Sequence, residues 1–299
     1  MVLGLTEQEA AAVATIGGVW QRRDWALWAT LALLSGKLTV DLLNWSLALD
    51  LKILVLTVFS RKAAGRDGGE QVVAANVDVV FVAMGLDGDY NLRRVERYLA
   101  VAWESGAEPV VVLTKRDLCD DADARAAAVR AVSGRAEVIV TSAKDGSGVD
   151  ALWRWLTARR TGAILGSSGA GKSTLANALL GRDALRTGEV RAHDQRGQHT
   201  TTRRELVVLP SGAMLIDTPG MRELQLWDVS RGLDAAFEDV VEVAARCRFR
   251  DCAHGKEPGC AVREALAAGV LDGARYASWE KLRDEAARAA KARRGRGRR

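Results

Sequence analysis

The chain has 299 residues, 48% of them hydrophobic and 27% charged, with a formal net charge of +5 and a sequence pI near 9.2. This composition is typical of a globular protein, and the small positive charge favours anionic partners without identifying one. No basic residue precedes Arg22, so the start lacks the basic region of a signal peptide, and the uncharged stretch at residues 25–36 is too short to span a bilayer as a helix. We therefore expect a cytoplasmic protein that makes no membrane contact.

The first sixty residues carry few signals. Residues 52–59 form an apolar run that suggests a buried strand, although its periodicity does not exclude a helix. Residues 61–70 are polar and glycine-rich, which predicts a linker or an exposed loop. We expect domain boundaries that divide the chain into residues 1–62, 63–228 and 229–299.

The middle of the chain alternates between apolar strand-like runs and helical patterns. We expect strands at residues 77–83, 109–114, 137–141, 162–165, 206–209 and 213–216, the last two as a hairpin, and helices at residues 91–105, 122–133, 149–159 and 173–180. Such alternation predicts an open α/β sheet that binds ligands at the carboxyl ends of its strands. After residue 227 the chain is rich in Ala, Glu and Arg, which predicts a separate helical domain that ends in a disordered basic tail over residues 291–299.

The strongest motif is a phosphate-binding loop. Gly166, Gly171, Lys172 and Ser173 satisfy the pattern G-x-x-x-x-G-K-[ST] between a predicted strand and a predicted helix. Lysine at this position reaches the β- and γ-phosphates, and the serine binds Mg²⁺. The expected nucleotide contacts are Gly166, Ser167, Ser168, Gly169, Ala170, Gly171, Lys172, Ser173 and Thr174.

A D-x-x-G segment, from Asp217 to Gly220, follows the last predicted strand and suits the loop that meets Mg²⁺ and the γ-phosphate. The next residue is Met221, where many GTPases carry a glutamine that orients the attacking water. Imidazole can take that role near neutral pH, so we expect His199 to be catalytic; the alternative is a solvated loop histidine. One threonine of residues 200–202 is expected to bind Mg²⁺, and Thr201 is taken into the nucleotide site.

A base-reading motif ends the strand predicted at residues 109–114. Its members are Thr114, Lys115, Arg116 and Asp117, and a second guanine loop is expected at Ser142, Ala143 and Lys144. An aspartate can accept hydrogen bonds from the N1–H and N2–H₂ edge of guanine. The common motif starts with asparagine, which is threonine here, and the alternative role of the aspartate is to cap a helix. Because this motif precedes the phosphate loop, whereas conventional GTPases place it downstream, the order indicates a circularly permuted GTPase.

Three of the four cysteines lie together near the C-terminus. Cys247, Cys252, His254 and Cys260 offer three thiolates and one imidazole, a complete tetrahedral set for one structural Zn²⁺. The alternative is buried free cysteines beside a chance histidine. We expect Cys119 to be an ordinary thiol.

These motifs together resemble the ribosome small-subunit-dependent GTPase A family of circularly permuted bacterial GTPases. The resemblance implies an N-terminal OB-fold, a C-terminal zinc domain, and GTP or GDP with Mg²⁺ as ligands. It also implies a monomeric late maturation factor of the 30S ribosomal subunit that binds 16S rRNA, is stimulated by the subunit, and uses His199 in hydrolysis. The N-terminal region lacks the family's Gly-Asp-Trp signature, so it is either a degenerate OB-like barrel or a stretch altered by a frameshift.

Two rival functions differ from this one. The chain could be an RNA-binding assembly protein that holds GTP as a static ligand, or a permuted GTPase with a non-ribosomal partner.

Overall fold

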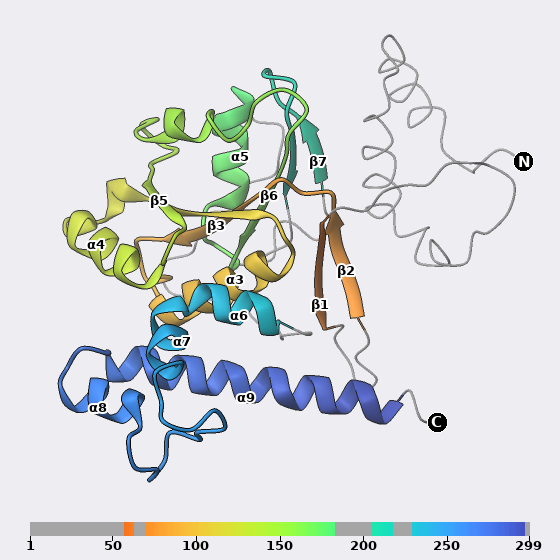
Figure 1. Ribbon diagram of the computed structural model, residues 1–299. Coiled ribbons are helices and arrows are strands. Elements are labelled where there is room, and N and C mark those ends of the chain that lie inside the picture. Colours follow the sequence, from red (N-terminus) through yellow and green to blue (C-terminus); the bar gives the residue numbers. More distant parts are fainter. Residues whose placement is uncertain (1–56, 63–69, 183–204, 218–228, 297–299) are drawn as a thin grey trace, which may run out of the picture.

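The computed structural model describes residues 57–62, 70–182, 205–217 and 229–296. Its centre is a six-stranded sheet with the order β5-β4-β3-β6-β8-β7 (Figure 1). The strands are β3 (Val79–Gly85), β4 (Glu108–Thr114), β5 (Glu137–Val140), β6 (Thr161–Gly166), β7 (Glu205–Val208) and β8 (Met214–Asp217). All neighbouring strands are parallel except β7 and β8, which form the predicted antiparallel hairpin. The predicted open α/β sheet is confirmed.

Both faces of the sheet are buried, which explains the continuous apolar runs of its strands. Val80 and Val82 of β3 join one hydrophobic cluster, while Val79 and Phe81 join a second, because successive side chains of a strand point to opposite faces. Covering helices on the first face are α3 (Leu92–Glu104), α4 (Ala122–Val132), α6 (Ser230–Ala236), α7 (Glu238–Ala244) and α9 (Gly273–Arg296). The second face is covered by α5 (Lys172–Leu180) and a 3₁₀ turn at Val149–Leu152.

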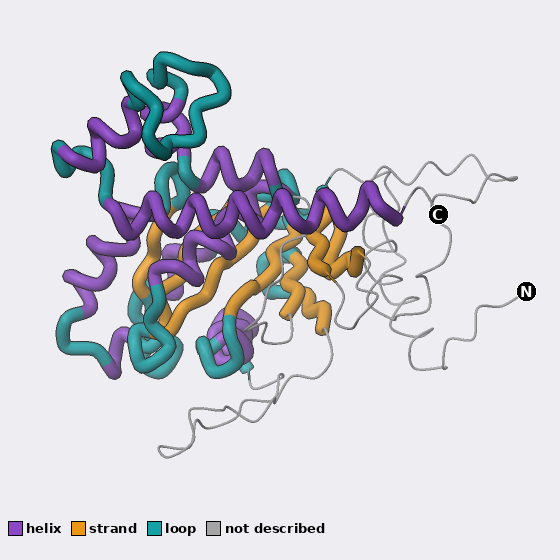
Figure 2. Tube along the Cα trace, turned by 90° about the horizontal axis from the view of Figure 1, so that it is seen from below, coloured by secondary structure: helices purple, strands orange, loops and turns teal. Residues whose placement is uncertain are grey.

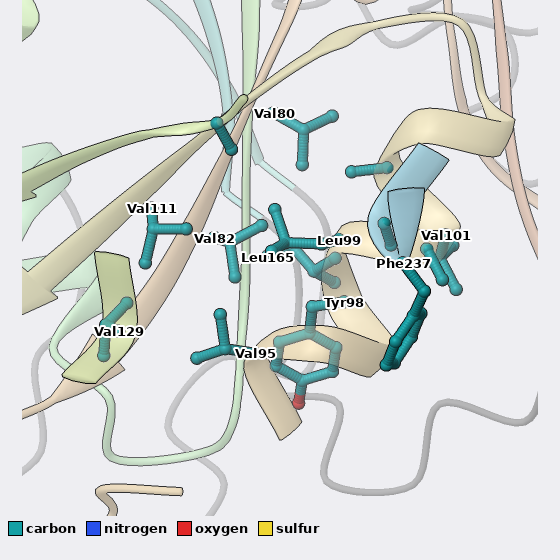
Figure 3. Close-up of a cluster of buried hydrophobic side chains, with 14 of the residues drawn as sticks. Val80, Val82, Val95, Tyr98, Leu99, Val101, Val111, Val129, Leu165 and Phe237 are labelled. Atoms are coloured by element: carbon teal, nitrogen blue, oxygen red, sulfur yellow. The ribbon is translucent and has the colours of Figure 1, made fainter. Parts of the chain in front are cut away.

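The C-terminal helices share the core of the sheet domain. Phe237, at the junction of α6 and α7, belongs to the same cluster of buried side chains as Tyr98 and Leu99 of α3 (Figure 3). A Cβ on Gly232 of α6 would lie 1.9 Å from the carbonyl oxygen of Ala100, so only glycine permits this close helix contact. Seen from below, α9 runs across this layer of helices (Figure 2). The expected boundary at residue 229 stays a prediction, but the hydrophobic core is continuous across it.

A separate two-stranded hairpin precedes the sheet. It consists of β1 (Val58–Lys62) and β2 (Glu70–Ala75), which pair antiparallel with an irregularity between Phe59 and Ser60. The linker expected at residues 61–70 is therefore wrong at its two ends, which are strand residues. Paired strands tolerate polar residues where one face is solvated, so polarity alone did not identify a loop here. Residues 52–56, the rest of the expected apolar strand, lie outside the described residues, as does the expected OB-like domain apart from residues 57–62.

Two helical expectations need correction. Residues 149–159 do not form one α-helix: a 3₁₀ turn is followed by further i→i+3 hydrogen bonds, such as Trp155 N to Leu152 O at 3.1 Å. Leu152 and Leu156 are nevertheless buried. The apolar spacing therefore predicted correctly which side chains are buried, but not the type of helix that buries them. The disordered tail is wrong as far as Arg296, because α9 continues to that residue through an alanine- and arginine-rich stretch of strong helix formers. Among the described residues, no helix is both long enough and apolar enough to cross a bilayer.

Candidate nucleotide and metal sites

The phosphate loop (residues 166–174) connects β6 to α5 at the carboxyl edge of the sheet. A Cβ on Gly166 would lie 2.4 Å from the Ala83 carbonyl of β3, so the close strand approach requires glycine. Gly169 and Gly171 have φ values of +83° and +81°, a backbone region that L side chains rarely adopt. Because Gly171 precedes the first turn of α5, the free N–H groups of that helix face the loop, which is the geometry of an anion-binding site.

Lys172 is folded into this loop. Its side chain is buried, and its Nζ donates a hydrogen bond of 2.7 Å to the Ser167 carbonyl oxygen. Burial lowers the pKa of Lys172 to about 8, although the carboxylates of Asp217 and Asp89 act in the opposite direction. A bound phosphate would supply the anion that this buried ammonium group favours.

Ser173 and Asp217 are brought together as expected. The Ser173 hydroxyl donates a hydrogen bond of 2.8 Å to Asp217 Oδ2, and Asp217 is fully buried at the end of β8. A hydroxyl and a carboxylate oxygen are suitable Mg²⁺ ligands, and a cation bound there would be held next to the phosphate loop.

The base-reading motif contacts the phosphate loop directly. Thr114 is buried, and its hydroxyl donates a hydrogen bond of 2.7 Å to the carbonyl oxygen of Ala170. Threonine therefore makes a direct connection between the two motifs, and a longer amide is not needed for it. Asp117 and Lys172 consequently belong to one edge of the sheet, in spite of the inverted order of the motifs.

The second guanine loop positions Asp117. Ser142 is fully buried, and its hydroxyl donates a hydrogen bond of 2.8 Å to Asp117 Oδ1. Ser142 Oγ also accepts a hydrogen bond of 3.3 Å from the backbone N–H of Lys144, so one serine orders both loops. Asp117 lies inside the short 3₁₀ turn Arg116–Leu118, and the residue that precedes the next helix, α4, is Asp121, so the alternative role of Asp117 as a helix cap is wrong.

Two carboxylates of this edge were missed in the sequence. Asp87 Oδ2 accepts a hydrogen bond of 2.6 Å from Lys115 Nζ, and Asp89 Oδ2 accepts one of 2.5 Å from the Ser167 hydroxyl. Both aspartates follow the carboxyl end of β3, and this position was the available signal, because ligand sites of parallel sheets gather at that edge. His199, Thr201 and Gly220 lie outside the described residues.

The four predicted metal ligands form a compact cluster. The ligand atoms of Cys247, Cys252, His254 and Cys260 all lie within 4.8 Å of one another. Zn–S bonds of about 2.3 Å place tetrahedral ligands roughly 3.8 Å apart, and the Cys247 and Cys260 sulfurs are 4.0 Å apart. The residues therefore fit one tetrahedral ion. The alternative of free cysteines beside a chance histidine does not explain why all four ligand atoms converge.

Two cysteines of the cluster differ in their acidity. Burial alone would raise the pKa of Cys247, but backbone hydrogen bonds from Val262 and Ala261 lower it overall, which favours the thiolate. Burial raises the pKa of Cys252 to about 11, so its thiolate is not favoured without a metal. His254 adopts a φ of +60° and packs its ring against Tyr276 and Trp279 of α9. The cluster is therefore attached to the long helix that covers the sheet domain.

Comparisons with known proteins agree with this geometry. The family model described as RsgA GTPase matches residues 56–227. A protein of Opitutus terrae named small ribosomal subunit biogenesis GTPase RsgA is 55% identical over 236 residues, which cover 79% of this chain and 64% of that protein. A protein of the same name from Xylella fastidiosa strain M23 is 49% identical over 272 residues, which cover 89% of this chain and 79% of that protein. The chain thus spans less than two thirds of the Opitutus relative.

Solved structures support the fold. YjeQ from Thermotoga maritima matches with a TM-score of 0.55 and 27% identity, over 78% of this chain and 76% of that chain. YloQ, described as a circularly permuted GTPase, matches with a TM-score of 0.52 and 21% identity, over 83% of this chain and 84% of that chain. The permuted GTPase arrangement predicted from the motif order is confirmed.

Proposed function

Because this chain belongs to the RsgA GTPase family, we propose that it binds GTP with Mg²⁺ and hydrolyses it to GDP and phosphate during maturation of the 30S ribosomal subunit. The relatives are named small ribosomal subunit biogenesis GTPases, which supports this proposal. We place the protein in the cytoplasm, as a monomer that meets 16S rRNA.

The observation that carries the proposal is the hydrogen bond from the Thr114 hydroxyl to the Ala170 carbonyl. It ties the base-reading motif to the phosphate loop, so one ligand can contact both. A guanine base at Asp117 would place its phosphates toward Lys172, and an adenine lacks the donor edge that the carboxylate accepts. The site therefore fits a guanine nucleotide better than an adenine nucleotide.

The division of labour within the site follows from residue chemistry. Ser173, Asp217 and Thr201 would hold Mg²⁺, which neutralises charge on the β- and γ-phosphates when bound. Lys172 and the Gly220 N–H would meet the γ-phosphate, and His199 would orient the attacking water in place of the glutamine that Met221 replaces. The loops that carry Thr201 and Gly220 could then report the nucleotide state to the ribosome.

The remaining regions serve binding in this proposal. Residues 1–62 would be an OB-like RNA-binding domain, residues 63–228 the GTPase domain, and residues 229–299 a zinc-bearing helical domain. The cysteine cluster would hold one structural Zn²⁺, because its four protein ligands leave no open position for chemistry.

GTP turnover with and without purified ribosomal subunits tests the function. We expect slow turnover alone, strong stimulation by 30S subunits and none by 50S subunits. Lys172→Ala should abolish turnover, because it removes the cation that contacts the transferred phosphate. A turnover rate that 30S subunits leave unchanged would contradict the ribosomal role.

His199→Ala separates an enzyme from a protein that holds GTP as a static ligand. The enzyme should lose turnover and keep nucleotide binding, whereas a static binder should not change. His193→Ala is the matched control, because it removes a second histidine from the same segment of the chain. If His193→Ala lowered turnover as much as His199→Ala, the proposed catalytic role of His199 would be wrong.

A further inference from the structure

The loop between β3 and α3 (residues 86–91) lies against the phosphate loop, although no nucleotide motif includes it. Asp89 Oδ2 accepts the Ser167 hydroxyl at 2.5 Å, and Arg94 Nη1 reaches the same hydroxyl at 3.3 Å. Arg94 also forms an ion pair with the Asp89 carboxylate. One carboxylate and one guanidinium therefore converge on the second residue of the phosphate loop.

Arg94 is held in place by the start of α3. Its backbone N–H is capped by Asn91 Oδ1 at 3.1 Å, and its Nη1 donates to the Asp89 carbonyl at 3.1 Å. The side chains of Arg94 and Asp89 are only 27% and 16% exposed, so solvent screens their charges incompletely. The ion pair is therefore largely shielded from solvent and anchored by backbone groups on both sides.

The position of Asp89 poses an electrostatic problem. Its carboxylate interacts with the ammonium group of Lys172, which is the group that should meet the phosphates. An uncompensated carboxylate next to this ammonium group would repel a bound triphosphate, since both carry negative charge. Arg94 removes this repulsion while Asp89 keeps its hydrogen bond to Ser167.

We propose, resting on the nucleotide site proposed above, that Asp89 and Arg94 are positioning residues of the phosphate site. Asp89 holds the Ser167 hydroxyl and with it the first turn of the phosphate loop. Arg94 neutralises Asp89, so that the loop can accept an anionic ligand. The affinity for phosphates then depends on the sum of the two charges and not on either residue alone.

A double-mutant cycle of Arg94→Met, Asp89→Asn and both together tests the proposal. The dissociation constants of fluorescent GDP and GTP analogues would be measured at low and high salt. We expect Arg94→Met to weaken GTP binding about tenfold, and GDP binding less, because GTP carries more negative charge. The double variant should recover most of the loss, because it leaves no net charge behind. High salt should reduce the defect of Arg94→Met.

Two further variants separate charge from shape. Arg94→Lys keeps the positive charge and should bind GTP within about threefold of the unsubstituted protein. Arg97→Met removes another arginine of α3. The guanidinium of Arg97 pairs with Glu285 of α9, with 2.7 Å between Nη1 and Oε1, so this substitution should leave both nucleotide affinities unchanged. If Arg94→Met does not fold, Asp89→Asn alone tests the charge: it removes a negative charge and keeps an acceptor for the Ser167 hydroxyl, so GTP binding should be unchanged or tighter, and weaker binding would overturn the proposal.

The outcomes distinguish this inference from the proposed function. If the unsubstituted protein binds neither GDP nor GTP, the nucleotide site and the inference both fail. If it binds both and the double variant is as weak as Arg94→Met, only the neutralising role of Arg94 is overturned. A merely structural pair would show that second result, since removing both partners of a structural contact does not restore it.

Discussion

The nucleotide site and the cysteine cluster are built in opposite ways. Thr114, Ser142, Ser167 and Asp217 meet at one sheet edge although they lie far apart in the chain, whereas the four metal ligands fall within fourteen residues, from Cys247 to Cys260. A dispersed site depends on the whole sheet, but a local cluster depends on a metal and a short segment. The two should therefore respond differently to substitution.

Loss of the proposed zinc ion should have the largest effect on stability and only a small effect on nucleotide binding. Cys252→Ser or chelation should remove one equivalent of zinc and lower the free energy of unfolding by several kcal/mol, because structural zinc contributes folding energy directly. GDP affinity should change less than about threefold. Zinc analysis, urea unfolding and nucleotide titration would check this. Cys119→Ser, outside the cluster, is the matched control and should keep both the zinc and the stability.

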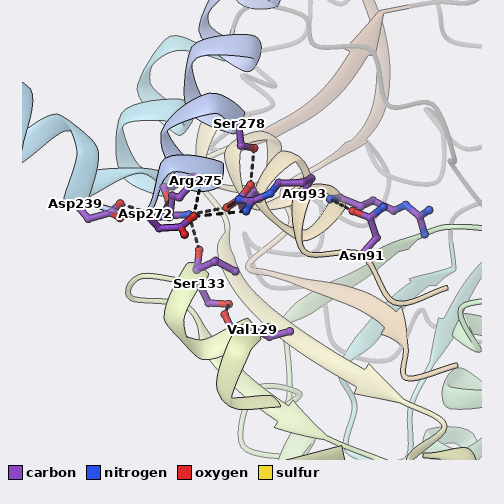
Figure 4. A network of polar contacts seen from close by, with 12 residues as sticks. Asn91, Arg93, Val129, Ser133, Asp239, Asp272, Arg275 and Ser278 are labelled. Carbon is purple, nitrogen blue, oxygen red and sulfur yellow. Dashed lines mark hydrogen bonds and ion pairs between the residues drawn. The ribbon is translucent and has the colours of Figure 1, made fainter. Parts of the chain in front are cut away.

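The second-largest effect on stability should come from the polar network that joins the C-terminal helices to the sheet domain. Arg275 of α9 donates to Glu96 of α3 at 3.1 Å and to Asp239 of α7 at 2.7 Å, while the Ser278 hydroxyl also donates to Glu96 at 2.5 Å (Figure 4). Glu96 is buried, and without Arg275 its only remaining cationic partner among the described residues is the partly exposed Arg93, so its charge loses its buried compensation. Arg275→Met should therefore cost about 3 kcal/mol of stability in urea unfolding.

Arg283→Met is the control for this network. Arg283 lies on the same helix, but its acidic partners Glu280 and Asp284 are exposed, so the loss should stay below about 1 kcal/mol. An equal cost for both substitutions would mean that burial of the Glu96–Arg275 pair does not matter.

Removing the hydrogen bond between the base-reading motif and the phosphate loop should have a moderate effect on nucleotide affinity. Thr114→Ala removes the hydroxyl that donates to Ala170 and should weaken GDP and GTP binding by about tenfold, equivalent to one hydrogen bond of about 1.4 kcal/mol. Thr114→Ser keeps the hydroxyl and should bind within about threefold of the unsubstituted protein. Unchanged affinity of Thr114→Ala in a fluorescent-nucleotide titration would show that the motifs act separately.

The smallest effect should be a pH dependence at Asp87. Burial by itself would raise the pKa of this carboxyl, but the hydrogen bond from Lys115 and the backbone N–H of Asp89 lower it below its ordinary value of 3.8. A lowered folded-state pKa stabilises the protein above the unfolded value, and this stability is lost as the pH falls through the folded value. Asp87→Asn should therefore be less stable at neutral pH, and the difference should shrink in acid. Urea unfolding from about pH 7 down to about pH 2 would detect it, and a difference that stays constant over this range would contradict the assignment.

The local motifs could be identified in the sequence because the residues of each motif lie close together in the chain. The phosphate loop, the base-reading motif and the cysteine cluster are short segments whose backbone or ligand requirements allow few residue types. The order of the first two even indicated the permutation, because it reports connectivity directly. By contrast, the apolar spacing at residues 149–159 predicted a helix where 3₁₀ turns occur, since burial and hydrogen bonding are separate properties.

The sequence by itself determined which chemical groups this protein carries and in which order they follow one another. Only the tertiary structure decided that Asp89 and Arg94 meet Ser167, that Arg275 compensates Glu96, and that Thr114 ties two motifs together. The physical reason is that these contacts join segments on different strands and helices. Parallel strands gather their carboxyl ends at one edge whatever the order of the chain, and the pairing of charges there follows from the fold and not from residue spacing.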